Sequence, residues 1–205
     1  MKFDRLSSTL VESVEILQLL QDEDTGNFAW TPVQRCCASV GLDTKSNLFS
    51  SVGIGARGAT VILRPRLKLT LHQAMRWNGQ FLFLTSIILS QERDRLDVKA
   101  ALCEPVTLTA KPQNRTGRDA LNLPTAVQQP DFTFPGILTE KYYQNALDEI
   151  YQAETLQRVL VMPKAIVLRP GDLVQLGAEA AYTVRQALDL DPYKNEYVIE
   201  RRKDI

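Results

Sequence analysis

Residues 75–87 read MRWNGQFLFLTSI, and this stretch decides the fold class. Its centre, Asn78-Gly79, is the preferred sequence of a two-residue type I′ turn, because both residues tolerate a positive φ. Aromatic and branched apolar residues, which strands favour, lie on either side of the turn. The stretch therefore predicts a β-hairpin. It contains no acid pair and no metal-binding cluster, so we expect its role to be structural.

Further strands are predicted on both sides of the hairpin. Thr9–Leu20 and Phe28–Val40 read as two strands joined at Asp22–Asn27, a cluster of residues that favour turns. Thr60–Leu71 has apolar side chains at alternate positions, which is typical of a half-buried strand, and Asp97–Cys103 can close the sheet. The pattern predicts one antiparallel β-module in the first half of the chain.

The chain divides into three predicted segments. Residues 1–104 form the first β-module, a small barrel. Residues 105–135 hold five of the ten prolines and are expected to form an extended connector. Residues 136–205 form a second β-module, led by a short helix over Thr139–Tyr151, where apolar residues recur at helical spacing. Its strands are expected at 159–162, 173–176, 182–188 and 196–201. The predicted fold class is mainly β, with two small antiparallel barrel or sandwich modules and one short helix.

Residue spacing raises the question of whether the two modules are related. Pro65 and Pro163 are 98 positions apart, and so are Gly79 and Gly177. The order of strands and turns is also similar in the two halves, but their identity is slight. Duplication and convergence of two small barrels both explain the spacing.

The composition is that of an ordinary globular protein. The 205 residues include 24 Lys and Arg and 24 Asp and Glu, and 44% are hydrophobic. No apolar run approaches the ~20 residues that span a bilayer, and the N-terminus lacks an apolar leader, so we expect neither membrane association nor secretion. The three cysteines, Cys36, Cys37 and Cys103, lack the spacing of a zinc site or a disulfide framework. We expect no metal and no cofactor.

Charge is unevenly distributed along the chain. No Asp or Glu occurs from Thr44 to Gln91, where six cations lie, whereas the first thirty residues hold six acids and two cations. Three explanations stay open: a surface for nucleic acid, a basic face on one subunit that meets an acidic face on the next, or chance clustering. The candidate interface residues are Asp22, Glu23, Asp24, Arg64, Arg66 and Lys68.

The residues that could carry catalysis have simpler explanations. Gly53–Gly58 matches G-x-G-x-x-G, but β-branched residues follow it and the next acid is Glu92, so we expect a loop rather than a dinucleotide site. His72 is the only histidine, and it lacks a nucleophile in a suitable motif. Glu12 and Glu15 read as solvated acids of a strand rather than as a catalytic pair. No catalytic residue is assigned, and an enzyme is not expected.

Three motifs occur in a distinctive order in the first module. The strand TVILRP at 60–65 precedes the hairpin RWNGQFLFLTSI at 76–87, and the charged stretch RDRLD at 93–97 leads into the closing strand. Over about residues 5–104 this order resembles the tailed-phage head–tail joining family, also called head-closure or stopper proteins. Members of that family form rings below the portal, line the DNA exit channel and join the filled head to the tail. Typical members end after one module, so residues 136–205 depart from the family pattern.

The resemblance implies a structural virion protein that assembles in the host cytoplasm as a sixfold or twelvefold ring. Its partners would be the portal or adaptor ring, the tail terminator or tail tube, and the genomic DNA that passes through the channel. The Gly- and Ser-rich loop at Gly41–Ala59 would face this channel. The channel residues would be Lys45, Ser50, Ser51, Gly53, Gly55, Arg57 and Gly58.

Two other functions stay open. A tail-tube or baseplate component would also use small β-barrels. A nucleic-acid-binding barrel would use the acid-free stretch and would stack bases on Trp30 or Trp77, although a buried aromatic anchor is the commoner role of such residues.

Overall fold

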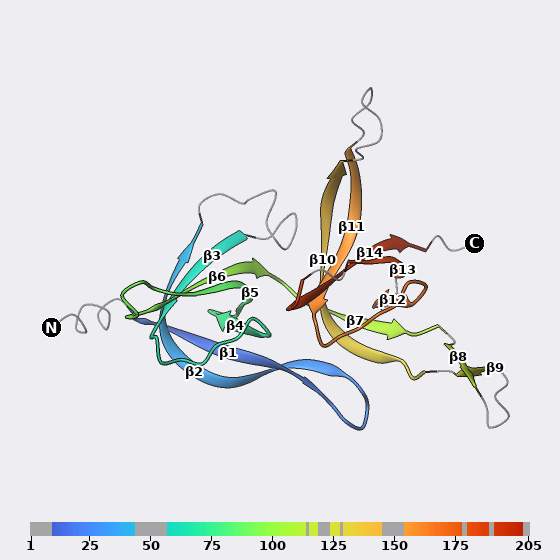
Figure 1. The fold of residues 1–205 in the computed structure, drawn as a ribbon, viewed down its shortest axis with the longest axis horizontal. Coiled ribbons are helices and arrows are strands. Elements are labelled where there is room, and N and C mark those ends of the chain that lie inside the picture. Colours follow the sequence, from blue (N-terminus) through green and yellow to red (C-terminus); the bar gives the residue numbers. More distant parts are fainter. Residues whose placement is uncertain are drawn as a thin grey trace. The chain divides into compact units, whose positions relative to one another are not determined.

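The computed structural model describes residues 10–43, 57–113, 115–118, 124–127, 129–144, 154–177, 180–188 and 191–202. Over these ranges the chain forms strands and turns and no helix (Figure 1). The strands are β1 Glu12–Gln21, β2 Phe28–Leu42, β3 Arg57–Leu63, β4 Gln73–Trp77, β5 Gln80–Leu89, β6 Leu96–Cys103, β7 Val106–Lys111, β8 Arg115–Arg118, β9 Pro124–Val127, β10 Phe132–Gln144, β11 Glu154–Pro163, β12 Leu173–Leu176, β13 Ala180–Leu188 and β14 Lys194–Arg201. The predicted mainly β class is confirmed.

The first six strands close into a barrel in the order β1-β2-β3-β6-β5-β4. Along β3, which pairs antiparallel with β6, Ala59, Val61 and Leu63 are buried, and the residues between them are more exposed. Because side chains alternate between the two faces of a strand, this pattern puts the apolar residues inside the barrel. The same core contains Val14, Met75, Leu82, Leu84 and Val98. Closure pairs every strand on both sides, so the barrel has no open sheet edge.

The Asn-Gly hairpin is confirmed. β4 and β5 pair antiparallel up to Trp77 and Gln80, which flank the two-residue turn. Asn78 has a φ of 49° and Gly79 a φ of 79°, as a type I′ turn requires. Local turn chemistry therefore fixes the register of these two strands.

The third strand ends earlier than predicted. β3 ends at Leu63 rather than at Leu71, and the Leu67 N–H donates to the Arg64 carbonyl oxygen at 3.3 Å to close a turn. Leu67, Leu69 and Leu71 nevertheless pack against the core. The period-two apolar pattern thus predicts the alternating burial correctly, but here it belongs to an unpaired extended connection.

The second barrel has the order β10-β11-β14-β13-β12-β7. If the six strands of each barrel are numbered along the chain, both barrels have the circular order 1-2-3-6-5-4. Both also carry a bulge in the fifth strand, at Thr85 in β5 and at Arg185 in β13. The four strands predicted for the second module are present as β11 to β14. The two-stranded sheet β8-β9 lies between the first and second strands of this barrel in the chain.

The turn after the third strand recurs as well. In the second barrel the Ile166 N–H donates to the Pro163 carbonyl oxygen at 3.0 Å, as Leu67 does to Arg64 in the first. Arg64 therefore corresponds to Pro163, one position away from the pairing of Pro65 with Pro163 that the sequence suggests. The shared strand order, bulge and turn favour duplication over convergence.

The interior of the second barrel is packed closely around Gly136. The neighbouring Leu108, Phe134 and Leu160 are completely buried. A Cβ atom added to Gly136 would lie 2.7 Å from Cδ1 of Leu160 and 2.8 Å from Cδ1 of Leu108. The space beside this position is filled by its neighbours, so the packing depends on a residue without a side chain.

The predicted helix over Thr139–Tyr151 is wrong where it can be compared. Residues 139–144 continue strand β10, and residues 145–151 lie outside the described residues. Thr139, Tyr142 and Tyr143 are good strand formers, and β10 is held in the barrel by β11 on one side and, at Phe132–Gly136, by β7 on the other. The long-range ladder outweighs the helical spacing of the apolar side chains.

The predicted Pro-rich connector over 105–135 is wrong at both of its ends. Val106–Lys111 is β7 and Phe132 begins β10, and both strands belong to the second barrel. Most of these prolines lie at the borders of strands, because a proline lacks the N–H that a ladder needs but is tolerated at a strand terminus, whereas Pro135 lies inside β10. Pro105 and Pro112 flank β7, for example. The second module therefore begins at Val106 rather than at residue 136.

The chain forms two compact units that follow the barrels with two exceptions, and one of them is that Thr139–Lys141 of β10 belongs to the first unit. The segment Gln21–Ala29, at the tip of the β1-β2 hairpin, belongs to the second unit. There the Thr133 N–H donates to Oδ1 of Asn27 at 2.7 Å. The rings of Phe28 and Phe132 meet edge to face, with their centroids 6.0 Å apart. These contacts order the tip beside strand β10.

Candidate functional site

The acidic turn, defined as Asp22, Glu23 and Asp24, is held in one conformation by its own backbone. Oδ1 of Asp22 accepts the N–H of Asp24 at 2.9 Å and that of Thr25 at 3.4 Å. These hydrogen bonds, that from Asp24 first, lower the pKa of Asp22 below its ordinary value. All three acids are exposed, and within the described ranges Glu23 and Asp24 have no ion pair. The turn presents fixed negative charge to solvent.

The basic ridge, defined as Arg64, Arg66 and Lys68, lies on the connection between β3 and β4. The three side chains are exposed and alternate with half-buried residues, among them Leu67, which packs against the core. No partner for the three cations occurs among the described residues. The apolar anchors therefore hold three positive charges in a fixed order on the surface.

The fold itself does not require cations on this connection. The equivalent turns make Arg66 correspond to Ala165 and Lys68 to Val167 in the second barrel. Ala165 is exposed there, and Val167 is 61% exposed. The same backbone thus carries small apolar residues in one barrel and cations in the other. The charge of the basic ridge is a property of the first barrel and not of the scaffold.

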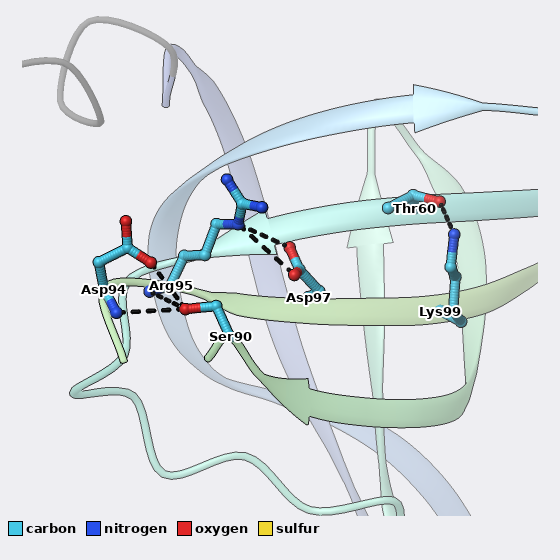
Figure 2. Close-up of polar contacts among 6 residues, drawn as sticks. All are labelled: Thr60, Ser90, Asp94, Arg95, Asp97 and Lys99. Atoms are coloured by element: carbon cyan, nitrogen blue, oxygen red, sulfur yellow. Dashed lines mark hydrogen bonds and ion pairs between the residues drawn. The ribbon is translucent and has the colours of Figure 1, made fainter. Parts of the chain in front are cut away.

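Next to the basic ridge, the charged motif 93–97 forms the turn that leads into β6 (Figure 2). Ser90 Oγ donates to Oδ1 of Asp94 at 2.6 Å, and Arg93 adopts a φ of 54°. Arg95 and Asp97 form an ion pair at 3.2 Å. Farther along β6, Figure 2 shows Lys99 reaching toward Thr60 on β3. The predicted charged turn before the closing strand is confirmed, and its polar residues mostly bind one another.

Two apolar residues near this turn are exposed, which was not predicted from the sequence. Ile88 is 56% exposed and Leu89 is 46% exposed at the end of β5. Leu20, next to the acidic turn, is 48% exposed. Consecutive residues of a strand point to opposite faces, so an apolar pair at the end of a strand is a signal that one of them faces solvent. The pair Ile88-Leu89 could have been noticed on that ground.

Only the base of the predicted channel loop lies within the described residues. Lys45, Ser50, Ser51, Gly53 and Gly55 lie outside them. Arg57 and Gly58 begin β3 rather than forming the tip of a loop. Likewise Gly41, Leu42 and Ala59 pair within the β2-β3 ladder, so the connection between these strands is shorter than predicted.

Polar contacts close the base of this loop. Nε of Arg57 donates to the carbonyl oxygen of Asp43 at 2.7 Å, and the Asp43 N–H donates to that of Gly58 at 2.9 Å. A Cβ atom on Gly58 would lie 2.1 Å from Oδ2 of Asp43, so glycine leaves room for that carboxylate. Arg57 is therefore tied to the backbone at the point where the chain leaves β2.

Glu12 and Glu15 have separate structural partners and do not form a carboxylate pair. Glu12 accepts hydrogen bonds from the N–H of Val40 at 3.1 Å and from the indole N–H of Trp77. Glu15 accepts from Nη2 of Arg35 at 2.6 Å. Glu12 thereby joins β1, β2 and β4, which are neighbours in the barrel.

The two tryptophans contact the first barrel. Trp77 packs against its core and donates to Glu12. The ring centroid of Trp30 lies 5.5 Å from that of Phe81. Both indoles therefore act as aromatic anchors, which leaves less of their surface for stacking on bases.

The half-buried thiols of Cys36 and Cys103 are poorly suited to nucleophilic chemistry. Burial raises the pKa of the Cys103 thiol to about 12, and burial together with the neighbouring Cys37 raises the pKa of Cys36. His72 is exposed. In the part of the chain that the structure describes, no group of three or more His, Cys, Asp or Glu side chains could hold a metal ion. None of the described segments is a helix long and apolar enough to cross a membrane.

Comparisons with known proteins give no family assignment. No family model, no curated protein and no solved structure matches the chain.

Proposed function

We propose that this chain is a structural virion protein of the tailed-phage head–tail interface, whose copies form a ring that lines or closes the DNA exit channel. The proposal rests on the resemblance of residues 5–104 to head–tail joining proteins. That resemblance implies a small β-barrel with a tight hairpin, a charged turn before the closing strand and a long acid-free loop.

One observation carries the proposal. The three stretches that make the resemblance form connected parts of a single closed barrel: β3 with its Arg-Pro end, the β4-β5 hairpin and the turn before β6. β6 lies between β3 and β5, so it brings all three together. The three motifs therefore contribute to one module, as the resemblance implies.

The position of the β2-β3 loop fits this role. Its base is closed by Asp43, Arg57 and Gly58, and residues 44–56 between them contain Lys45 and no acid. A segment without negative charge can approach DNA without repulsion. With one Lys and one Arg from Lys45 to Gly58, it lacks the dense cations of a tight binder. Weak attraction suits a passage through which a genome must move.

The direct test is the location of the protein in phage particles. Immunogold labelling of purified virions is expected to mark the neck, between the head and the tail. Inactivation of the gene is expected to give DNA-filled heads that lack tails, counted by electron microscopy. Label on the tail tube or baseplate would favour a tail component instead. Absence from the particles, together with normal particles after inactivation, would rule out a virion role.

The basic ridge supports a second candidate, a nucleic-acid-binding barrel. Binding that depends on these cations would fall steeply with salt, because each phosphate contact releases a counterion. Fluorescence anisotropy with single- and double-stranded oligonucleotides at low salt tests this function. Loss of binding in Arg64→Glu with unchanged folding would support it, and no binding of either probe to the unmodified protein would exclude it.

A further inference from the structure

We infer that the basic ridge of one copy binds the acidic turn of a second copy of this chain, in a head-to-tail contact. This inference deepens the proposed function, because it names the contact that would build the ring. The two surfaces are different patches of one chain, so the contact is heterologous. Heterologous contacts that repeat produce rings when the rotation between subunits closes.

First, the basic ridge is not required by the fold. At the corresponding positions the second barrel carries Ala165 and Val167 in the same kind of connection. Arg66 and Lys68 are exposed, whereas the side chain that anchors this segment, Leu67, packs on the core. The cations therefore need an explanation outside the fold, and a partner of opposite charge supplies one.

Second, the acidic turn is preorganised. The carboxylate of Asp22 is occupied by backbone N–H groups, which leaves Glu23 and Asp24 projecting from a fixed turn. The tip is also held by Thr133, whose N–H donates to Oδ1 of Asn27. Binding to a turn that is already ordered loses less conformational entropy than binding to a flexible segment.

Third, each charged surface has exposed apolar side chains beside it. Leu89 pairs with Leu96 across β5 and β6, and Leu96 pairs with Leu63, the residue before Arg64. Two strand spacings, about 10 Å, therefore separate the end of β5 from the start of the basic ridge. Beside the acidic turn, the exposed apolar residue is Leu20, two positions before Asp22. Apolar contact can add the affinity that exposed ion pairs alone do not provide.

Charge reversal tests the contact. The ridge variant is Arg66→Glu/Lys68→Glu, and the turn variant is Glu23→Lys/Asp24→Lys, which keeps Asp22 to maintain the turn. Self-association is measured by sedimentation velocity at low and high salt. Each variant alone is expected to weaken it by about tenfold or more. An equimolar mixture of the two is expected to associate again, because the acidic turn of the ridge variant meets the unmodified ridge of the turn variant.

A matched control separates this contact from a general effect of charge. Lys111→Glu/Arg202→Glu makes the same change in net charge as the ridge variant, at two exposed positions in the second unit. It is expected to associate like the unmodified protein. All variants are first compared by circular dichroism and Tm, which exposed substitutions are expected to leave nearly unchanged.

Three results would overturn the inference. In the first, the ridge and turn variants associate as strongly as the unmodified protein; a ring would then form through other surfaces, and the proposed function would stand. In the second, the unmodified protein stays monomeric at all concentrations, and the location in particles then decides the proposed function separately. In the third, the ridge variant loses binding to a double-stranded oligonucleotide but keeps its self-association, which would assign the ridge to DNA.

Discussion

Replacement of Gly136 by alanine tests whether the second barrel is as closely packed as its geometry indicates. The new Cβ would lie 2.7 Å from Cδ1 of Leu160, 2.8 Å from Cδ1 of Leu108 and 3.3 Å from Cε2 of Phe134. Carbon atoms in contact normally lie 3.5–4.0 Å apart. All three neighbours are completely buried in a closed barrel, so none of them can move into solvent.

The expected cost follows from two opposing effects. Adding a methyl group to a filled core costs about 1–3 kcal/mol through strained rotamers and backbone shifts. The change from glycine to alanine also removes conformational freedom from the unfolded chain, which returns about 0.4–1 kcal/mol. The net loss is about 1–2 kcal/mol, or roughly 4 °C or more in Tm for a unit of this size.

Thermal and urea unfolding measure this loss, with circular dichroism as the probe of both units. Trp30 and Trp77 both belong to the first unit, so tryptophan emission follows that unit and is expected to respond less to Gly136→Ala. Gly41→Ala is the matched control, because its Cβ would meet only the carbonyl oxygen of Thr60, at 3.9 Å. In the double variant Gly136→Ala/Leu160→Val the clashing Cδ1 of residue 160 is absent. The combined loss of unfolding free energy is therefore expected to be smaller than the sum of the two single losses. A Gly136→Ala protein as stable as the original would refute the packing argument.

Three further predictions concern individual polar groups. Glu12→Ala is expected to lower the free energy of unfolding by about 1–3 kcal/mol, because the indole N–H of Trp77 and a backbone N–H lose their acceptor. Glu12→Gln, which keeps one acceptor oxygen, is expected to cost less; equal losses in urea unfolding would contradict this account. The lowered pKa of Asp22 means that its contribution to stability is present above the unfolded-state pKa and is lost as the pH falls through the folded-state value. The advantage over Asp22→Asn is therefore expected to decrease as the pH falls below about 4, and an undiminished advantage at pH 2 would exclude this cause. At pH 8 iodoacetamide is expected to modify the exposed Cys37 while Cys103, whose pKa is raised to about 12, reacts only after unfolding; mass spectrometry of tryptic peptides distinguishes the two.

Features set by local chemistry could be predicted from the sequence, whereas features set by distant pairing could not. The hairpin at Asn78-Gly79 was predictable because few dipeptides accept a positive φ at both positions. The segment 139–144 was predicted as helix because its apolar spacing is the local signal, yet it continues strand β10, whose partners β7 and β11 lie elsewhere in the chain. The prolines around β7 suggested a connector because composition does not reveal which strand ends they mark. Pairings such as β1 with β4 have no local signature at all.

The same distinction applies to the candidate surfaces. The charges of the basic ridge and the acidic turn can be counted in the sequence, and the turn itself follows from its residue types. That Arg66 and Lys68 are exposed while Leu67 is packed needed the fold. The match to Ala165 and Val167 needed both barrels, because it depends on equivalent turns and not on sequence identity.

The two barrels also indicate how such a chain could assemble. Closed barrels have no open edge, so a partner cannot extend either barrel by adding a strand, and contacts with a barrel use exposed side chains such as those on its connections. The first barrel offers the cations of the basic ridge there. At the equivalent connection the second barrel exposes Val167. The Lys164 N–H on this connection donates to the carbonyl oxygen of Tyr193 at 3.1 Å. This hydrogen bond holds the connection before β14 beside it, and the tyrosine there is 40% exposed. Salt screens contacts between exposed charges but has little effect on apolar ones. A contact through the first barrel is therefore expected to weaken as salt rises from 50 to 500 mM, while a contact through Val167 and Tyr193 persists. Sedimentation of Lys68→Val, which gives the first barrel the residue of the second, would show whether that salt dependence comes from the ridge: an unchanged dependence would exclude it.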